Sequence, residues 1–127
     1  MKNGRRIAAR RAAETRRFYA IEEECTDPVL LRELPMHRLQ ALGRRIWEGC
    51  GRKGDCPPIV AGRGVEQAGR LLSYYEDGKG GQRVHIMLAR NHRCKQVLIH
   101  EMVHALGYGT HGIGFQGVYF ALVGGYR

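Results

Sequence analysis

The sequence has no long apolar run and, after position 101, no acidic residue. No stretch approaches the roughly 18 consecutive apolar residues that mark a transmembrane helix, and the basic N-terminus lacks the apolar segment of a signal peptide. We therefore expect a cytoplasmic protein that does not insert into a membrane. The second absence limits any catalytic or metal site, because no carboxylate beyond Glu101 can contribute to it.

Cysteine is also scarce, with four residues in a chain of 127. In the cytoplasm we expect all four to be thiols. Cys50 and Cys56 flank a Gly-rich loop, but their spacing is not that of a zinc knuckle, and only Cys25 and Cys94 remain to complete a second site. Buried or loop thiols are therefore the preferred interpretation, and a second, structural metal is the alternative.

The length and composition are those of one small globular domain covering residues 1–127. At this size a chain buries about two-thirds of its surface, so a hydrophobic core can form without disulfides. A loop rich in Gly at 49–58 separates a basic helical part, residues 1–50, from a part that mixes strands and helices, residues 57–127.

Hydrophobic periodicity predicts helices at 5–24, from Pro35 onward and at 113–122, and short strands at 59–61, 71–75 and 84–88. A turn signal at 76–81 makes the last two strands a hairpin, and Asn91 is placed to cap the helix that follows. The side chains expected to face inward are Ile7, Phe18 and Ile21 on the first helix, Met36, Leu39, Leu42 and Ile46 on the second, and Phe115, Val118, Tyr119 and Leu122 on the last.

Residues 100–104 read His-Glu-Met-Val-His, within an otherwise apolar helix predicted from about 97 to 106. Two histidines at this spacing lie on one face of a helix, so both imidazoles can bind one Zn²⁺, and the glutamate beside the first can activate a water molecule on that ion. Burial of His100, Glu101 and His104 without partners would be costly, and a metal with its water would remove that cost. The alternative is that they are core side chains with ordinary hydrogen-bond partners.

A catalytic zinc takes three protein ligands and leaves a fourth position for water. Since no acidic residue follows Glu101, the third ligand cannot be a downstream glutamate. His111 is the only later histidine, and it follows a Gly-rich segment suited to a sharp reversal at the end of the helix. We favour His111, with His85, His92 and Cys94 upstream as alternatives.

The HExxH run, followed by Ala105 and then by His-Gly-x-x-Phe at 111–115, resembles the SprT-like zinc metalloproteases, the group that contains Spartan. The resemblance covers about residues 84–122. The chain is also similar to a small metallohydrolase family of actinobacteria and their phages. The resemblance implies that Glu101 is the general base, that proteins or peptides, some of them associated with DNA, are the substrates, and that the zinc ligands are His100, His104 and His111.

The expected fold is a minimal zincin-like α+β domain, with N-terminal helices, a small sheet with a hairpin, the HExxH helix and a C-terminal helix. The expected function is that of a zinc metallopeptidase. An exposed edge on the strand before the HExxH helix could bind a peptide as an added strand, or that strand could be only part of the sheet. Tyr74, Tyr75, Tyr108 and Tyr119 are candidates to stabilise an oxyanion, although aromatic side chains more commonly fill cores.

Positive charge dominates the chain, with 21 Lys and Arg against 12 Asp and Glu and a net charge of +9. In residues 1–20 Glu14 is the only acid, against Lys2, Arg5, Arg6, Arg10, Arg11, Arg16 and Arg17. Such a face can attract phosphate backbones without sequence preference, or it can be a solvated helix surface. In the first interpretation DNA is a partner, and the residues that contact it include Arg5, Arg6, Arg10 and Arg11. The alternative to an enzyme is then a basic nucleic-acid-binding module whose zinc site is structural or vestigial.

Overall fold

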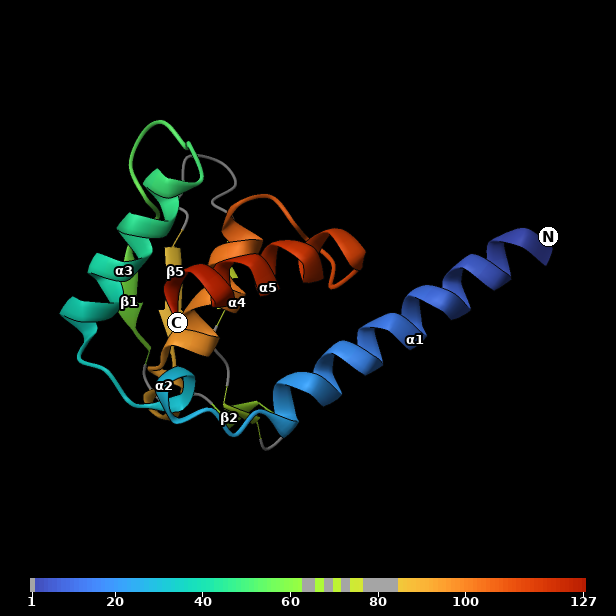
Figure 1. Cartoon of the computed structure of the whole chain (residues 1–127), viewed down its shortest axis with the longest axis horizontal. Helices are drawn as coiled ribbons and strands as arrows, with labels where there is room; N and C mark the ends of the chain where they lie inside the picture. Colours follow the sequence, from blue (N-terminus) through green and yellow to red (C-terminus); the bar gives the residue numbers. More distant parts are fainter. Residues whose placement is uncertain (1, 63–65, 68–69, 72–73, 77–84) are drawn as a thin grey trace.

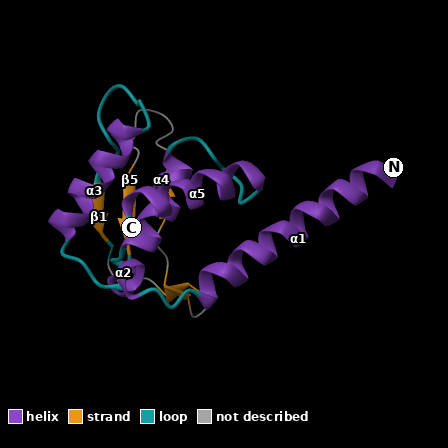
Figure 2. Ribbon diagram, viewed as in Figure 1, coloured by secondary structure: helices purple, strands orange, loops and turns teal. Residues whose placement is uncertain are grey.

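The computed structural model describes residues 2–62, 66–67, 70–71, 74–76 and 85–127. Its helices are α1 (Lys2–Glu24), α2 (Pro28–Leu31), α3 (Met36–Gly49), α4 (Lys95–Ala105) and α5 (Ile113–Tyr126). Its strands are β1 (Ile59–Ala61), β2 (Glu66–Gln67), β3 (Arg70–Leu71), β4 (Tyr74–Glu76) and β5 (His85–Leu88), and a 3₁₀ turn covers Arg90–His92. Helices and a small sheet are both present, so the α+β class expected from the sequence is confirmed (Figure 2). Within the described residues, none of these helices is both long and apolar enough to cross a membrane.

A three-stranded sheet has the order β1-β5-β4. β1 pairs in parallel with β5, with Ile59 opposite Ile86 and Ala61 opposite Leu88, whereas β4 pairs antiparallel with β5. β2 and β3 form a separate antiparallel pair. The antiparallel pairing expected of the two strands of the hairpin is confirmed for β4 and β5. The idea that the strand before the HExxH helix offers an exposed edge is wrong, because β5 is the central strand and is hydrogen-bonded on both sides.

The hydrophobic core lies between the sheet, α3 and α4. From α3 it receives the predicted side chains Leu39, Leu42 and Ile46, with Met36 packed against its margin. Gly43 lets α3 approach closely, because a Cβ at this position would overlap the Ile59 side chain of β1. α4 contributes four fully buried side chains, Leu98, Ile99, Met102 and Val103. The apolar helix predicted around the HExxH motif is therefore buried as expected, and the core holds it in place.

α1 projects away from the rest of the protein, with its C-terminal end against the body and its N-terminal part extended alone (Figure 1). Every side chain from position 4 to 12 is exposed. Phe18 is the only fully buried side chain among those described in α1. The prediction that Ile7 and Ile21 also face inward is wrong, since they are 52% and 45% exposed. The helix meets the body through the face of Phe18, near its C-terminal end.

Two predicted boundaries differ in the second half of the chain. α4 begins after Cys94, which has extended backbone angles and occupies the N-cap, whereas Asn91 lies in the preceding 3₁₀ turn and does not cap α4. The strand predicted at 71–75 appears as parts of β3 and β4, which are separate strands. The rest of the predicted turn, residues 77–81, and position 84 lie outside the described residues.

The break predicted after α1 contains a short helix that the sequence pattern did not reveal. Asp27 accepts a hydrogen bond from the backbone N–H of Val29 and caps α2, which begins at Pro28. At the other end of the chain α5 continues past its predicted end at 122 to Tyr126. The Lys95 ammonium donates to the Tyr126 carbonyl at 3.1 Å, which satisfies a terminal carbonyl of the longer helix.

Candidate metal centre

α4 carries the HExxH motif in its C-terminal half. His100 and His104 leave the same face of the helix because they are one turn apart, and their ring centroids are 5.1 Å from each other. Glu101 lies one position further round and is only 6% exposed. Since the opposite side of α4 is packed into the core, the backbone positions of all three residues are fixed by a buried helix.

The end of α4 turns the chain back toward the motif. Gly107 has a φ of +114°, which is accessible to glycine and strained for other residues. Its N–H donates to the His104 carbonyl at 3.0 Å, and the N–H of Tyr108 donates to the Val103 carbonyl at 3.3 Å, which is the hydrogen-bond pair of a Schellman C-cap. This reversal, expected from the glycines of the segment, returns the chain so that His111 lies beside the motif.

Three imidazole nitrogens from two segments meet at one point. The Nε2 atom of His111 lies 3.0 Å from Nε2 of His100 and 3.1 Å from Nε2 of His104. The three ligand atoms all lie within 4.8 Å of one another, close enough to bind one metal ion. In the part of the chain that the structure describes, no other group of three or more His, Cys, Asp or Glu side chains has this geometry. The structure thus brings together the three residues favoured from the sequence.

Hydrogen bonds on the outer side of two rings determine which nitrogen faces the centre. His104 Nδ1 lies 2.7 Å from the Tyr108 carbonyl, and because a carbonyl only accepts, Nδ1 carries the proton and Nε2 presents a lone pair. His100 Nδ1 lies 2.8 Å from the Glu22 carboxylate, which also only accepts when ionised. The neutral forms of both rings therefore direct an unprotonated Nε2 at the same point.

The third ring, His111, cannot supply enough protons to satisfy the lone pairs that meet at this point. His111 Nδ1 lies 2.9 Å from the Tyr19 hydroxyl, which can accept or donate. If the proton of His111 is on Nε2, that single N–H faces the Nε2 lone pairs of both His100 and His104. If the proton is on Nδ1, the Nε2 lone pairs of all three rings face one another. Either arrangement is unfavourable without a cation, and a metal ion satisfies all the lone pairs at once. The donor set therefore fits a metal.

The electrostatics of the centre favour neutral rings. Burial, together with the neighbouring His100 and His104, lowers the pKa of His111 to about 4. Burial is also the main cause that lowers the pKa of His104, although the hydrogen bond to Tyr108 acts in the opposite direction. Both rings are therefore uncharged at neutral pH and can bind a metal without first losing a proton.

Aromatic rings enclose the imidazoles. The centroid of Phe115, near the start of α5, lies between 4.8 and 5.1 Å from the centroids of all three histidine rings. Phe18 of α1 lies 6.1 Å from both His100 and His111 and meets Phe115 edge-on. Because Phe18 and Phe115 are fully buried, they restrict rotation of the imidazoles and exclude water from one side of the centre.

A pocket of about 540 Å³ opens beside His100 and Glu101, which both line it. Its walls come from the C-terminal end of α1, from Leu31 of α2, from the 3₁₀ turn and from α4 as far as Glu101. Of the three candidate ligands, only His100 lines this pocket. Its volume is in the range of protein sites that bind small molecules or short peptide segments.

The alternative ligands lie outside the cluster. His85 on β5, His92 in the 3₁₀ turn and Cys94 before α4 are not among the converging side chains. Burial raises the pKa of the Cys94 thiol, which disfavours the thiolate that a metal requires. All four cysteines are free, and within the described residues neither Cys50 nor Cys56 belongs to a metal-binding group.

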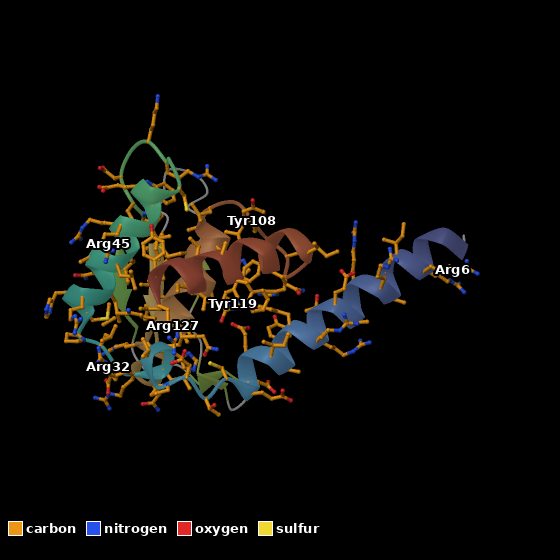
Figure 3. All side chains as sticks on the ribbon, in the orientation of Figure 1. Arg6, Arg32, Arg45, Tyr108, Tyr119 and Arg127 are labelled. Atoms are coloured by element: carbon orange, nitrogen blue, oxygen red, sulfur yellow. The ribbon has the colours of Figure 1, made fainter. Side chains whose placement is uncertain are left out.

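The tyrosines proposed as oxyanion-stabilising residues have other roles where they are described. Tyr119 is 3% exposed, and its ring lies 5.0 Å from that of Phe18, on the side of α5 that faces α1 (Figure 3). Burial raises its pKa, with a further contribution from the charge of a nearby glutamate. Tyr108 is exposed, and it contacts the centre through its backbone carbonyl. The side chains of Tyr74 and Tyr75 lie outside the described residues.

Two residues that contact the candidate ligands were not identified from the sequence. Glu22 and Tyr19 both belong to α1, where they lie one turn apart and close to Phe18, so one face of the helix carries all three. This spacing can be read from the sequence. Nothing in the sequence connects that face to His100, which is 78 positions away from Glu22.

The N-terminal arginines expected to contact nucleic acid do not approach the centre. Arg5, Arg6, Arg10 and Arg11 are exposed on the projecting part of α1, and Figure 3 shows Arg6 near its far end. At about 1.5 Å per helical residue, Arg6 is about 18 Å along the helix from Phe18. In the structure, α1 is the element that connects these arginines to the metal centre.

Comparison of the chain with protein-family models, with curated proteins and with solved structures gives no match.

Proposed function

We propose that this protein is a zinc-dependent metallohydrolase, and specifically a metallopeptidase of the SprT-like type. The observation that carries the proposal is the convergence of three imidazole nitrogens beside a buried glutamate. Three histidines are a ligand set of catalytic zinc, in which a fourth position is left for water, whereas structural zinc is usually enclosed by four protein ligands. Among the described residues no fourth His, Cys, Asp or Glu joins the group.

Zinc suits both the donor atoms and their spacing. With Zn–N bonds of about 2.0–2.1 Å and tetrahedral angles, ligand nitrogens lie about 3.3 Å from one another. The two distances from His111 Nε2 to its neighbours are 3.0 and 3.1 Å, and all three ligand atoms lie within 4.8 Å of one another, so shifts of the rings would be enough to reach that geometry. Imidazole nitrogens also favour Zn²⁺ over Mg²⁺ and Ca²⁺, which prefer oxygen ligands.

We assign Glu101 as the general base. A bound zinc ion would lower the pKa of a water molecule to about 7. The Glu101 carboxylate would accept a proton from that water as the water attacks a peptide carbonyl, and it would then deliver the proton to the leaving amine. The outer hydrogen bonds of His100 and His104 would keep their rings oriented throughout, because neither proton on Nδ1 has to move.

The pocket beside Glu101 supports a peptide or protein as the substrate. At about 540 Å³ it can accommodate an extended segment next to the proposed base. The resemblance of the HExxH run and of the His-Gly-x-x-Phe segment at 111–115 to SprT-like proteases points to the same substrate class.

Metal removal should abolish hydrolysis reversibly. Protein treated with a strong chelator should lose its activity against a labelled unfolded protein, and one equivalent of Zn²⁺ should restore it. Mg²⁺ should not, because the centre offers imidazole nitrogens and not oxygens. Zinc-loaded protein that cleaves no protein or peptide would instead favour a non-peptide amide substrate or the binding module described next.

The projecting part of α1 supports a second proposal, that this part binds nucleic acid. No acid precedes Glu14, and the arginines of this part are exposed on a helix that extends away from the body (Figure 1). Phosphate backbones would be attracted to such a helix by counterion release, without sequence preference. Combined with the metal centre, this would direct hydrolysis to DNA-associated proteins. Without catalysis, the protein would be a nucleic-acid-binding module with a structural or vestigial zinc site.

Replacing Arg5, Arg6, Arg10 and Arg11 together by Gln should flatten the salt dependence of DNA binding. If each contacts one phosphate, the slope of log K against log salt should fall by about 3 to 4. The measurement is fluorescence anisotropy with a duplex of random sequence over a series of salt concentrations. In a cleavage assay, added DNA should stimulate the wild type and not this variant.

A matched control replaces two exposed arginines of α3, Arg38 and Arg44, by Gln. This variant loses positive charge away from α1 and should retain most of the slope. Affinity that survives both high salt and the four substitutions in α1 would show that these arginines form a solvated helix face.

A further inference from the structure

The C-terminal end of α1 holds the outer side of two candidate ligands. The Glu22 carboxylate lies 2.8 Å from His100 Nδ1, and both side chains are only 15% exposed. The Tyr19 hydroxyl lies 2.9 Å from His111 Nδ1. The ring of His104 is held differently, by the carbonyl of Tyr108 at the end of its own helix. α1 therefore supplies two of the three outer partners.

Other contacts of α1 with the body lie in the same place. Phe18 packs against the imidazoles and is the only fully buried side chain described in this helix. Gln96 of α4 donates to the Glu22 carbonyl at 3.2 Å, and Gln116 of α5 donates to the Glu14 carbonyl at 3.2 Å. Since the described part of α1 before Ala13 is exposed, the contacts that dock this helix are concentrated around the metal centre.

We propose that the C-terminal part of α1 is the outer layer of the metal centre, so that metal binding and docking of α1 strengthen each other. The proposal rests on the metal site of the proposed function. A carboxylate that accepts from Nδ1 orients the imidazole and makes Nε2 a better ligand, and loss of such a partner typically weakens metal binding about 10- to 100-fold. Thermodynamic reciprocity requires that the metal favours the docked helix by the same factor that the docked helix favours the metal.

The opposite charges of the Glu22 carboxylate and of a bound cation make this coupling favourable. Without a cation, the Glu22 carboxylate accepts from a neutral ring whose Nε2 atom lies 3.0 Å from Nε2 of His111. With a divalent cation on Nε2, the Nδ1–H of His100 becomes a stronger donor and the carboxylate faces positive charge. Tyr19 and Glu22 also line the pocket beside Glu101, so metal loading stabilises one wall of that pocket.

The test is the zinc affinity of the full chain, measured by competition with a chromogenic chelator. Glu22→Ala should weaken zinc binding about 10- to 100-fold. Tyr19→Phe, which removes a single hydroxyl, should weaken it by a smaller factor. Glu24→Ala is the matched control, because it removes an exposed carboxylate from the last turn of the same helix and should bind zinc as the wild type does.

Amide hydrogen exchange provides a second readout that needs no variant. Zinc should slow exchange at residues 15–24 of the wild type and leave residues 4–12 unchanged, because only the first segment docks on the centre. Wild-type protein that binds no zinc would refute the metal site itself. Zinc binding without protection of residues 15–24, or with equal affinity in folded Glu22→Ala and wild type, would overturn the coupling and leave the metal site standing.

Discussion

Replacing any one of His100, His104 and His111 by Ala should remove most of the zinc from a protein that otherwise binds about one ion per chain. In the described part of the chain each imidazole supplies one of three converging nitrogens, so each variant retains two of them. Two nitrogens on a partly exposed surface should not hold the ion against dialysis with a weak chelator. The measurement is metal content by mass spectrometry, with circular dichroism to verify the fold.

Three further variants test whether the loss of zinc is specific to the three proposed ligands. His92→Ala should keep the zinc because His92 lies outside the cluster, and His37→Ala should do so because His37 is exposed on α3. Glu101→Gln should also keep it, since Glu101 is not a ligand in our proposal. Full retention by His111→Ala together with loss in His92→Ala would move the third ligand to the 3₁₀ turn and contradict the geometry described above.

Glu101→Gln should slow hydrolysis about 10²- to 10⁴-fold, the usual cost of removing a positioned general base. The amide has nearly the size of the carboxylate but cannot accept and release the proton. Because Glu101 is only 6% exposed, this near-isosteric change avoids opening a cavity, and the fold and zinc content should be those of the wild type. The measurement is the initial rate of cleavage of a labelled unfolded protein by zinc-loaded samples.

The control for that experiment is Glu48→Gln, which removes an exposed carboxylate near the end of α3. Its cleavage rate should equal that of the wild type. A Glu101→Gln variant with full activity and a full complement of zinc would exclude Glu101 as the base and end the proposed mechanism. A variant that loses both activity and zinc would indicate that Glu101 supports the site rather than the chemistry.

The three candidate metal ligands could be predicted from the sequence because the features that position them are local. The spacing of His100 and His104 follows from the helical repeat, and the apolar residues around them indicate a buried helix. Gly107 marks the reversal after α4 because few other residues adopt its backbone conformation. With no acid after Glu101 and one later histidine, His111 is the favoured third ligand, and the structure excludes the upstream alternatives His85, His92 and Cys94 from the cluster.

Other predictions failed where a local pattern has no information about neighbouring segments. Ile7 and Ile21 belong to the apolar pattern of α1, but they stay about half exposed among the described residues, because that helix meets the body near Phe18. Asn91 is a good capping residue, yet it lies in a 3₁₀ turn, and Cys94 occupies the N-cap of α4. Period-two alternation identified β5 as a strand, but alternation does not reveal how many neighbours a strand has.

The side chains that can hold a metal follow from short segments of the chain, because helical periodicity, glycine conformation and the imidazole donor set are local properties. The orientation of those ligands, and the surface that lies beside them, depend on how distant segments pack. Glu22 meets His100 across 78 positions, and Tyr19 meets His111 across 92. Such contacts arise when α1 packs against α4 and α5, and the packing of distant segments depends on the shape of the whole core, which no local pattern encodes.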